Sequence, residues 1–212
     1  AKQPKLLLLD EPLGALDKKL REETQIELVN IIESVGVTCV MVTHDQEEAM
    51  TMASRIGIMS EGHILQVGSP REVYETPATR FVADFIGNVN LMDGELVVDE
   101  ADHCEVACAD VRHRVGHGIT GHEGMAVSVG LRPEKIRIGK QPPEPHPGDA
   151  PAPLNMVKGT VQDIVYFGDS TVYHLKLASG AVLKVSQGNT ERHVADALTW
   201  GDEAYAAWSP SA

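Results

Sequence analysis

The sequence is poor in basic residues and in long apolar runs, and each shortage excludes something. Lys and Arg number 18 against 31 Asp and Glu, the formal net charge is −13, and the longest basic cluster is Lys18-Lys19-Leu20-Arg21. Because binding to a phosphate backbone requires a basic footprint, we expect no nucleic-acid partner. No apolar stretch has the ~20 residues of a membrane span and no signal peptide opens the chain, so work at a membrane would require docking on membrane subunits.

Cysteine is also scarce, and its usage indicates the compartment. The three cysteines, Cys39, Cys104 and Cys108, leave one unpaired in any disulfide scheme, which is typical of the reducing cytoplasm. Two of them lie in residues 103–122, a stretch that also holds four histidines. The spacing from Cys104 to Cys108 is wider than in the usual zinc sites, which disfavours a structural metal, and the role of this stretch stays open.

The most informative stretch is Leu6-Leu7-Leu8-Leu9-Asp10-Glu11-Pro12. Consecutive leucines in a run too short for a membrane span fit a strand that is buried on both faces of a parallel sheet, and Pro12 would end it. Ligands of open α/β sheets bind at the carboxyl ends of the strands, so Asp10 could hold Mg²⁺ and Glu11 could orient a water that attacks a terminal phosphate. In isolation, an ordinary strand end with solvated acids would look the same.

Further motifs follow in order. Gly14-Ala15-Leu16-Asp17 comes next, and a second apolar strand, Val37 to Val42, leads into Thr43-His44-Asp45. The series LLLLDEP, GALD and VTHD resembles the ATP-binding subunits of ABC transporters, in which these are the Walker B motif, the D-loop and the switch-histidine loop. Each motif alone is weak evidence, whereas the three at this separation are specific. The resemblance implies an α/β fold, that of a P-loop ABC nucleotide-binding domain.

The resemblance also implies a role for each matching residue. Asp10 resembles the Walker B aspartate that positions Mg²⁺ through water, and Glu11 the catalytic glutamate beside the attacking water. His44 resembles the histidine that hydrogen-bonds the γ-phosphate, and Asp17 the aspartate at the interface between two nucleotide domains. The implied catalytic residues are therefore Glu11 and His44, those that bind the nucleotide are Asp10 and Asp17, and the cofactors are ATP and Mg²⁺.

Other motifs of the family are missing from the sequence. It contains no GxxxxGK[ST] loop to cradle the β- and γ-phosphates, no LSGGQ signature and no upstream glutamine loop. We therefore interpret the chain as the C-terminal portion of a truncated nucleotide-binding domain followed by a tail. By itself it is expected to be inactive and to hold no ATP or Mg²⁺.

Periodicity and capping patterns predict the other elements before residue 87. A helix is expected over residues 18–35, with Gly36 as its stop and an apolar face formed by Leu28, Ile31, Ile32 and Val35. Asp45 and Glu48 form a capping-box pattern for a helix to about Ser54. A hairpin is expected over residues 56–67, and two short helices are expected to open at Ser69-Pro70 and at Thr76-Pro77.

The pattern changes near Gly87-Asn88, where we place a domain boundary. Beyond it, short segments of alternating apolar residues predict an all-β barrel or sandwich, with an exposed proline-rich loop over residues 141–153. Leu131-Arg132-Pro133-Glu134-Lys135-Ile136 resembles the "RPE" segment of the TOBE domain, an OB-like β-barrel appended to many importer ATPases. Residues 168–175 and 198–203 resemble the tails of putrescine/spermidine importer ATPases. The expected domains are 1–87, part of an ABC nucleotide-binding domain, and 88–212, a TOBE-type regulatory β-barrel.

The implied function is that of the ATP-hydrolysing subunit of an ABC importer, with a polyamine (putrescine or spermidine) as the solute. Such a subunit lies on the cytoplasmic side of the inner membrane, docks on integral membrane permease subunits, forms a homodimer, and meets a periplasmic solute-binding protein only indirectly. The alternatives are an importer ATPase for another solute, such as sugar, iron or sulfate, and a non-enzymatic regulatory, dimerisation or small-ligand-binding module. A non-transport ABC ATPase acting on DNA or ribosomes would share the three motifs, but the acidic charge and the RPE-type tail argue against it.

Overall fold

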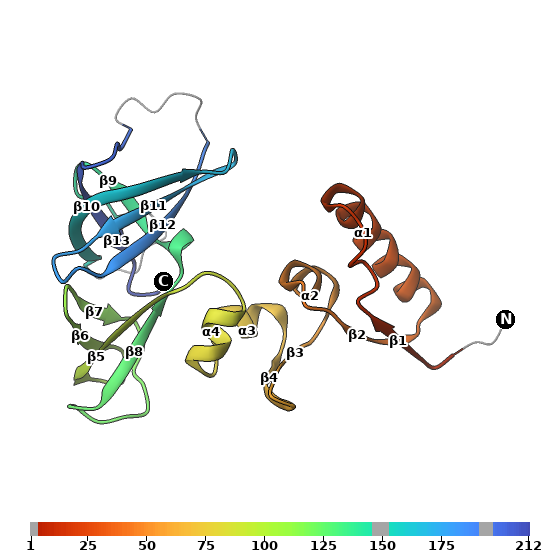
Figure 1. Ribbon diagram of the computed structural model, residues 1–212. Helices are drawn as coiled ribbons and strands as arrows, with labels where there is room; N and C mark the ends of the chain where they lie inside the picture. Colours follow the sequence, from red (N-terminus) through yellow and green to blue (C-terminus); the bar gives the residue numbers. More distant parts are fainter. Residues whose placement is uncertain (1–3, 146–152, 191–196) are drawn as a thin grey trace. The chain divides into compact units, whose positions relative to one another are not determined.

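The computed structural model describes residues 4–145, 153–190 and 197–212. It divides into two compact units, residues 1–87 and 88–212 (Figure 1). Each unit has a hydrophobic core of its own. None of the described helices has the length and apolar character needed to cross a membrane. The first unit contains β1 (Leu6–Asp10), α1 (Lys18–Val35), β2 (Thr38–Val42), α2 (Gln46–Met52), β3 (Ile56–Ser60), β4 (His63–Gly68), α3 (Pro70–Glu75) and α4 (Arg80–Phe85).

Strand β1, helix α1 and strand β2 form a βαβ unit. The strands pair in parallel from Leu6 opposite Thr38 to Asp10 opposite Val42. Helix α1 has the predicted bounds, because Asp17 caps its start and Gly36, with φ of 67°, supplies the left-handed residue that ends it.

The predicted apolar face of α1 is only partly covered. Ile31 and Val35 are exposed, whereas Gln25 is buried, and the side-chain oxygen of Gln25 accepts a hydrogen bond from Thr51 of α2 at 3.3 Å. The packed face of the helix is therefore the one turned toward α2.

The prediction that the leucine strand is buried on both faces is wrong for the described chain. Side chains on one face of the β1–β2 pair are exposed, with relative accessibilities of 51% for Leu6, 69% for Leu8 and 51% for Val40. Within the described residues β1 pairs with β2 alone, and no layer covers this face. The run of leucines indicated the strand correctly but not its surroundings.

The rest of the first unit packs around a small core of Ile56, Ile58, Val73, Val82 and Ile86. The predicted hairpin forms as β3 and β4, and its two-residue turn has positive φ at both Glu61 and Gly62. Helix α3 opens at Ser69-Pro70 as predicted, and Ser69 and Glu72 form a capping box at its start. Helix α4 begins later than expected: its N-cap is Thr79, because Thr76 is used to end α3.

The second unit is built from strands. They are β5 (Asn90–Asp99), β6 (Cys104–Cys108), β7 (Arg112–Val115), β8 (Ala126–Leu131), β9 (Arg137–Gly139), β10 (Asn155–Tyr166), β11 (Ser170–Lys176), β12 (Val182–Gly188) and β13 (Glu203–Trp208), with a short 3-10 helix η1 (Pro133–Lys135). One sheet has the order β7-β6-β5-β8, and the other has the order β12-β11-β10-β13-β9. The predicted alternation is confirmed, since Leu175, Leu183 and Val185 are buried in the main core. Part of the predicted proline-rich loop, 146–152, lies outside the described residues.

The two sheets repeat one four-stranded pattern. The orders β7-β6-β5-β8 and β12-β11-β10-β13 match strand for strand, and each long strand is bulged at the corresponding place, after Leu96 in β5 and after Val161 in β10. Gly94 and Gly159 also correspond. A Cβ on either glycine would lie 2.5 Å or 2.6 Å from a backbone oxygen of the neighbouring strand, closer than any side chain allows.

Reciprocal asparagine clamps join the two halves. The side chain of Asn90, at the start of β5, accepts from the Lys184 N–H at 2.7 Å and donates to the Lys184 carbonyl at 2.8 Å. Asn155, at the start of β10, makes the same pair of bonds with Arg114 of β7, at 2.7 Å and 2.9 Å. Each asparagine side chain thereby pairs with the backbone N–H and carbonyl of one residue in the other half, as a neighbouring strand would do.

Candidate functional site

The candidate site lies where β1 and β2 end side by side. Their parallel register brings Asp10 level with Val42, so the residues that follow each strand meet at one edge of the pair. The Glu11 N–H donates to the Val42 carbonyl at 2.8 Å, which extends the ladder one residue beyond β1. The structure thus brings the acids after β1 next to the Thr43-His44-Asp45 turn after β2.

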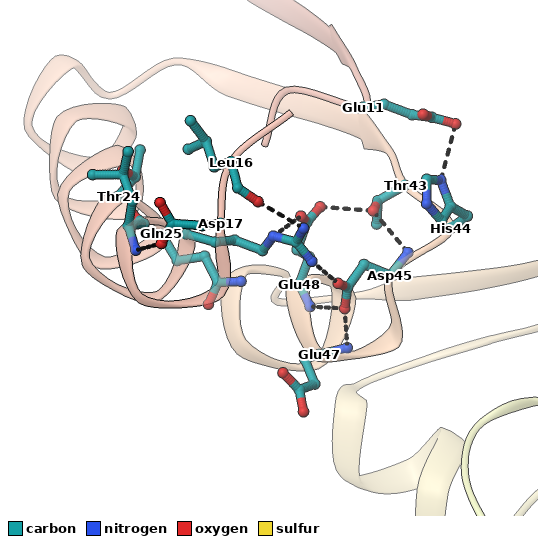
Figure 2. Close-up of polar contacts among 12 residues, drawn as sticks. Glu11, Leu16, Asp17, Thr24, Gln25, Thr43, His44, Asp45, Glu47 and Glu48 are labelled. Carbon is teal, nitrogen blue, oxygen red and sulfur yellow. Dashed lines mark hydrogen bonds and ion pairs between the residues drawn. The ribbon is translucent and has the colours of Figure 1, made fainter. Parts of the chain in front are cut away.

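Glu11 and His44 are in direct contact. Glu11 Oε1 lies 3.1 Å from His44 Nδ1, and both side chains are open to solvent, at 53% and 75% relative accessibility (Figure 2). The Glu11 backbone has φ of 43°, a left-handed conformation that non-glycine residues seldom adopt. Backbone strain of this kind often occurs at functional sites, where neighbouring contacts hold it in place.

Polar contacts of Thr43 and Asp45 fix the turn that carries His44. Thr43 Oγ1 donates to Glu48 Oε2 at 2.7 Å and accepts from the Asp45 N–H at 3.0 Å. Asp45 Oδ1 accepts from the N–H groups of Glu47 and Glu48, so it caps α2 (Figure 2). His44 therefore projects from a turn whose flanking residues are fixed on both sides.

The predicted capping box at α2 is wrong in its second half. Asp45 caps the helix, but the Glu48 carboxylate bonds to the Thr43 hydroxyl and does not return to the Asp45 backbone. The Thr43 hydroxyl can donate and accept at the same time, so it pairs with both the Glu48 carboxylate and the Asp45 N–H, which a capping box would have paired with each other. Helix α2 also ends at Met52, slightly before the predicted Ser54.

The two other predicted site residues lie apart from this contact. Asp17 is exposed at the start of α1, where its side chain accepts from the Leu20 N–H at 3.1 Å. Asp10 is exposed at the end of β1, next to Glu11 in sequence. The structure therefore brings Glu11 and His44 into contact, with Asp10 one position earlier at the end of β1 and Asp17 at the start of α1.

Asp10 and Glu11 offer the carboxylate oxygens that Mg²⁺ prefers. Among the described residues, no group of three His, Cys, Asp or Glu side chains is arranged to hold a metal ion. An ion at this edge would need waters or phosphate oxygens as further ligands, which is the usual way in which Mg²⁺ is bound beside a nucleotide.

Sequence reasoning missed two residues of the site. Arg21 of α1 reaches both Leu16 and Asp45, and Glu48 is almost completely buried beside it. Arg21 stood out in the sequence only as part of the longest basic cluster, and Glu48 only as a capping residue. The spacing of Thr43 and Glu48 in the sequence does not by itself predict that the two side chains bond to each other or that Glu48 is buried.

The cysteine- and histidine-rich stretch, 103–122, lies in the second unit and is spread over different environments. Cys104 and His113 are buried, whereas His117 and His122 are exposed and turn toward neighbouring carbonyl groups. Burial raises the pKa of both the Cys104 and Cys108 thiols, which keeps them protonated and unreactive at neutral pH.

Comparison with known proteins finds a family match for residues 129–212 and relatives that align with nearly the whole chain. Residues 129–212 match the TOBE domain family. The chain is 48% identical over 210 residues to the putrescine transport ATP-binding protein PotG of Escherichia coli, covering 98% of this chain and 54% of that protein. It is 43% identical over 209 residues to the spermidine/putrescine import ATP-binding protein PotA of Chromobacterium violaceum, covering 97% and 56%.

The chain thus spans about half the length of the curated relatives that it matches. Among solved structures, the cytoplasmic molybdate-binding protein ModG is similar with a TM-score of 0.47 and 15% sequence identity, over 57% of this chain and 91% of that one.

Proposed function

We propose that this chain, a homologue of importer ATP-binding subunits over nearly its whole length, is part of a subunit that hydrolyses ATP to energise uptake of a polyamine. Residues 1–87 are then the C-terminal part of a P-loop ABC nucleotide-binding domain of α/β type. Residues 88–212 form its TOBE-type regulatory domain, with an OB-like barrel architecture. The polyamine assignment is supported by the names of the relatives, which include putrescine and spermidine/putrescine importers.

The observation that carries the proposal is the contact of Glu11 with His44 at the end of two parallel strands. A carboxylate and an imidazole within hydrogen-bond distance, at the carboxyl edge of parallel strands, can serve proton transfer and phosphate recognition. Both side chains are open to solvent, so a ligand could approach them.

Each side chain has a distinct task in the proposed reaction. ATP supplies the phosphoryl group, and Asp10 would hold Mg²⁺ through water. Glu11 orients the attacking water and accepts its proton, while His44 donates a hydrogen bond to the terminal phosphate. Asp17 meets the opposing nucleotide domain. Catalysis of this kind is mostly positioning and charge stabilisation, so displacing either turn would slow hydrolysis.

The phosphate cradle and the signature motif are not in this sequence, so we expect hydrolysis only in a longer form of the subunit. That subunit is proposed to work as a homodimer on the cytoplasmic side of the inner membrane, docked on integral permease subunits. Contact with a periplasmic solute-binding protein is then indirect.

The test is Glu11→Gln in the intact subunit. The amide keeps the shape of the side chain but cannot accept the proton, so kcat should fall by about 10² or more while ATP still binds. Glu47→Gln, on the same edge of the structure but exposed and used only through its backbone, is the matched control. ATPase rates and nucleotide titration of both variants check the prediction, and turnover within a few-fold of the unmodified subunit in Glu11→Gln would refute the role of Glu11.

A further inference from the structure

One guanidinium joins the two turns that flank the Glu11–His44 contact. Arg21 Nη2 donates to the carbonyl of Leu16, the residue before Asp17, at 3.0 Å. Its Nη1 donates to Asp45 Oδ2, in the residue after His44, at 2.6 Å. A single planar group thus holds the backbone of the first turn and the side chain of the second.

The surroundings of Arg21 fix its position. Its side chain is 28% exposed, and its Nε lies 3.8 Å from Glu48 Oε1, a carboxylate whose side chain is only 2% exposed. Glu48 is in turn bonded to Thr43. A buried carboxylate is costly unless it is paired. Glu48 accepts a hydrogen bond from Thr43 and forms an ion pair with Arg21, whose Nε makes no hydrogen bond among the described residues.

The geometry points to Arg21 as a positioning residue that couples the turn of residues 14–17 to the turn of residues 43–45. Displacement of either turn changes the place of the guanidinium and is transmitted to the other. The importance of this coupling for hydrolysis rests on the proposed function, in which Asp17 meets the opposing nucleotide domain and His44 meets the phosphate. Under that function, Arg21 would couple the contact of Asp17 with the opposing nucleotide domain to the position of His44.

Arginine is required for this task because its donors form a rigid fork. Lysine carries the same charge on one rotatable ammonium group, which can pair with Asp45 but cannot hold both partners in a fixed geometry. The substitution Arg21→Lys is therefore a graded probe, and Arg21→Gln removes the charge while keeping a good helix former in α1.

Amide hydrogen exchange of the 212-residue chain, followed by NMR, tests the coupling without any nucleotide. Two hydrogen-bonded amides report on the turns: Leu16 N–H, bonded to the Leu13 carbonyl at 3.0 Å, and Asp45 N–H, bonded to Thr43 Oγ1 at 3.0 Å. Val73 N–H, in the core of the same unit, is the reference. Lys18→Gln, on the exposed side of α1, is the matched control variant.

Arg21→Gln should accelerate exchange at both turns by roughly 10-fold, with Arg21→Lys in between and Val73 unchanged. The sharper variant is Asp45→Asn, which keeps a good N-cap but weakens the bond to Arg21. It should accelerate exchange at Leu16, which Asp45 does not touch. The coupling is overturned if Leu16 is unaffected in Asp45→Asn, if Arg21→Gln changes only one turn, or if Val73 accelerates equally, which would indicate general loosening. Because ATP takes no part, these outcomes are independent of the ATPase assignment.

Discussion

His113 is a polar residue at a buried position, and the equivalent position in the other half of the second unit is a leucine. Its side chain is fully buried in β7, its Nε2 has no hydrogen-bond partner among the described residues, and its ring lies 5.2 Å from that of Trp208. In the repeated four-stranded pattern His113 pairs with Val106 as Leu183 pairs with Leu175, so Leu183 is its counterpart. Burial lowers the pKa of His113 to about 4.

The lowered pKa makes the second unit sensitive to acid. The unfolded chain binds a proton at His113 below about pH 6.5 while the folded chain does so only near pH 4, so stability is complete above about 6.5 and is lost as the pH falls toward 4. The loss amounts to roughly 3 kcal/mol at its full extent. His113→Leu should therefore be at least as stable as the unmodified chain at pH 7.5 and progressively more stable than it at lower pH.

Urea unfolding followed by tryptophan fluorescence measures this effect. Both tryptophans, Trp200 and Trp208, belong to the second unit, so the signal reports on that unit alone. His117→Gln, an exposed histidine in the same unit, should behave as the unmodified chain at every pH. Parallel loss of stability in the unmodified chain and in His113→Leu would show that other groups govern the acid sensitivity.

At the level of residues, the sequence predicted those that sit in contiguous motifs. Glu11 and His44 were proposed because they lie in motifs that resemble those of ABC ATPases, and parallel pairing of β1 with β2 brings the two side chains into contact. Arg21 and Glu48 were not found, because their roles depend on how α1 packs beside α2. His113 was noticed only as part of a possible metal cluster, since its burial depends on strand register.

At the level of elements, strands and helix ends could be predicted but the repeat could not. The two halves share few identities beyond Asn90 with Asn155 and Gly94 with Gly159, and these are separated by unrelated residues. What the halves share is backbone: a bulge, a close approach between strands, and an amide that bonds across to the other half. Such features constrain only a few side chains, so the repeat leaves little trace in the sequence.

The asparagine clamps give a prediction about how the two halves hold together. Asn90→Ala or Asn155→Ala removes both bonds to a partly buried peptide group, of Lys184 or Arg114, and leaves its N–H and carbonyl unpaired. Each variant should lose about 1–3 kcal/mol of unfolding free energy. The loss should be larger for Asn90→Ala, because Asn90 Nδ2 also donates to the Leu131 carbonyl at 3.2 Å. Urea unfolding by tryptophan fluorescence measures them. The control is Gln187→Ala, an exposed residue of β12, and a loss in either asparagine variant no larger than in this control would mean that the clamps are not structural.

At the level of the whole molecule, the surface of the first unit is the feature that sequence patterns misjudged. Four leucines predict a strand with both faces covered, yet Leu8 and its partner Val40 are exposed on one face of the β1–β2 pair. The apolar composition of a strand indicates that its faces favour burial, but it does not show that other parts of the chain cover them. An exposed apolar face of this kind favours association and competes with any physiological interface.

The homodimer proposed above therefore has two candidate surfaces, and they can be separated. We expect the dimer to be held by residues 88–212, because one self-complementary patch on the second unit would serve both chains. The competing surface is the β1–β2 face of the first unit. Light scattering over a concentration series should give a dimer mass for the full chain and for residues 88–212 alone, which form a compact unit with its own core. Leu8→Lys with Val40→Lys, which places charges on the exposed face without touching the second unit, should leave the dimer intact. A monomeric 88–212 unit, or a full chain made monomeric by the two lysines, would assign association to the leucine strand instead.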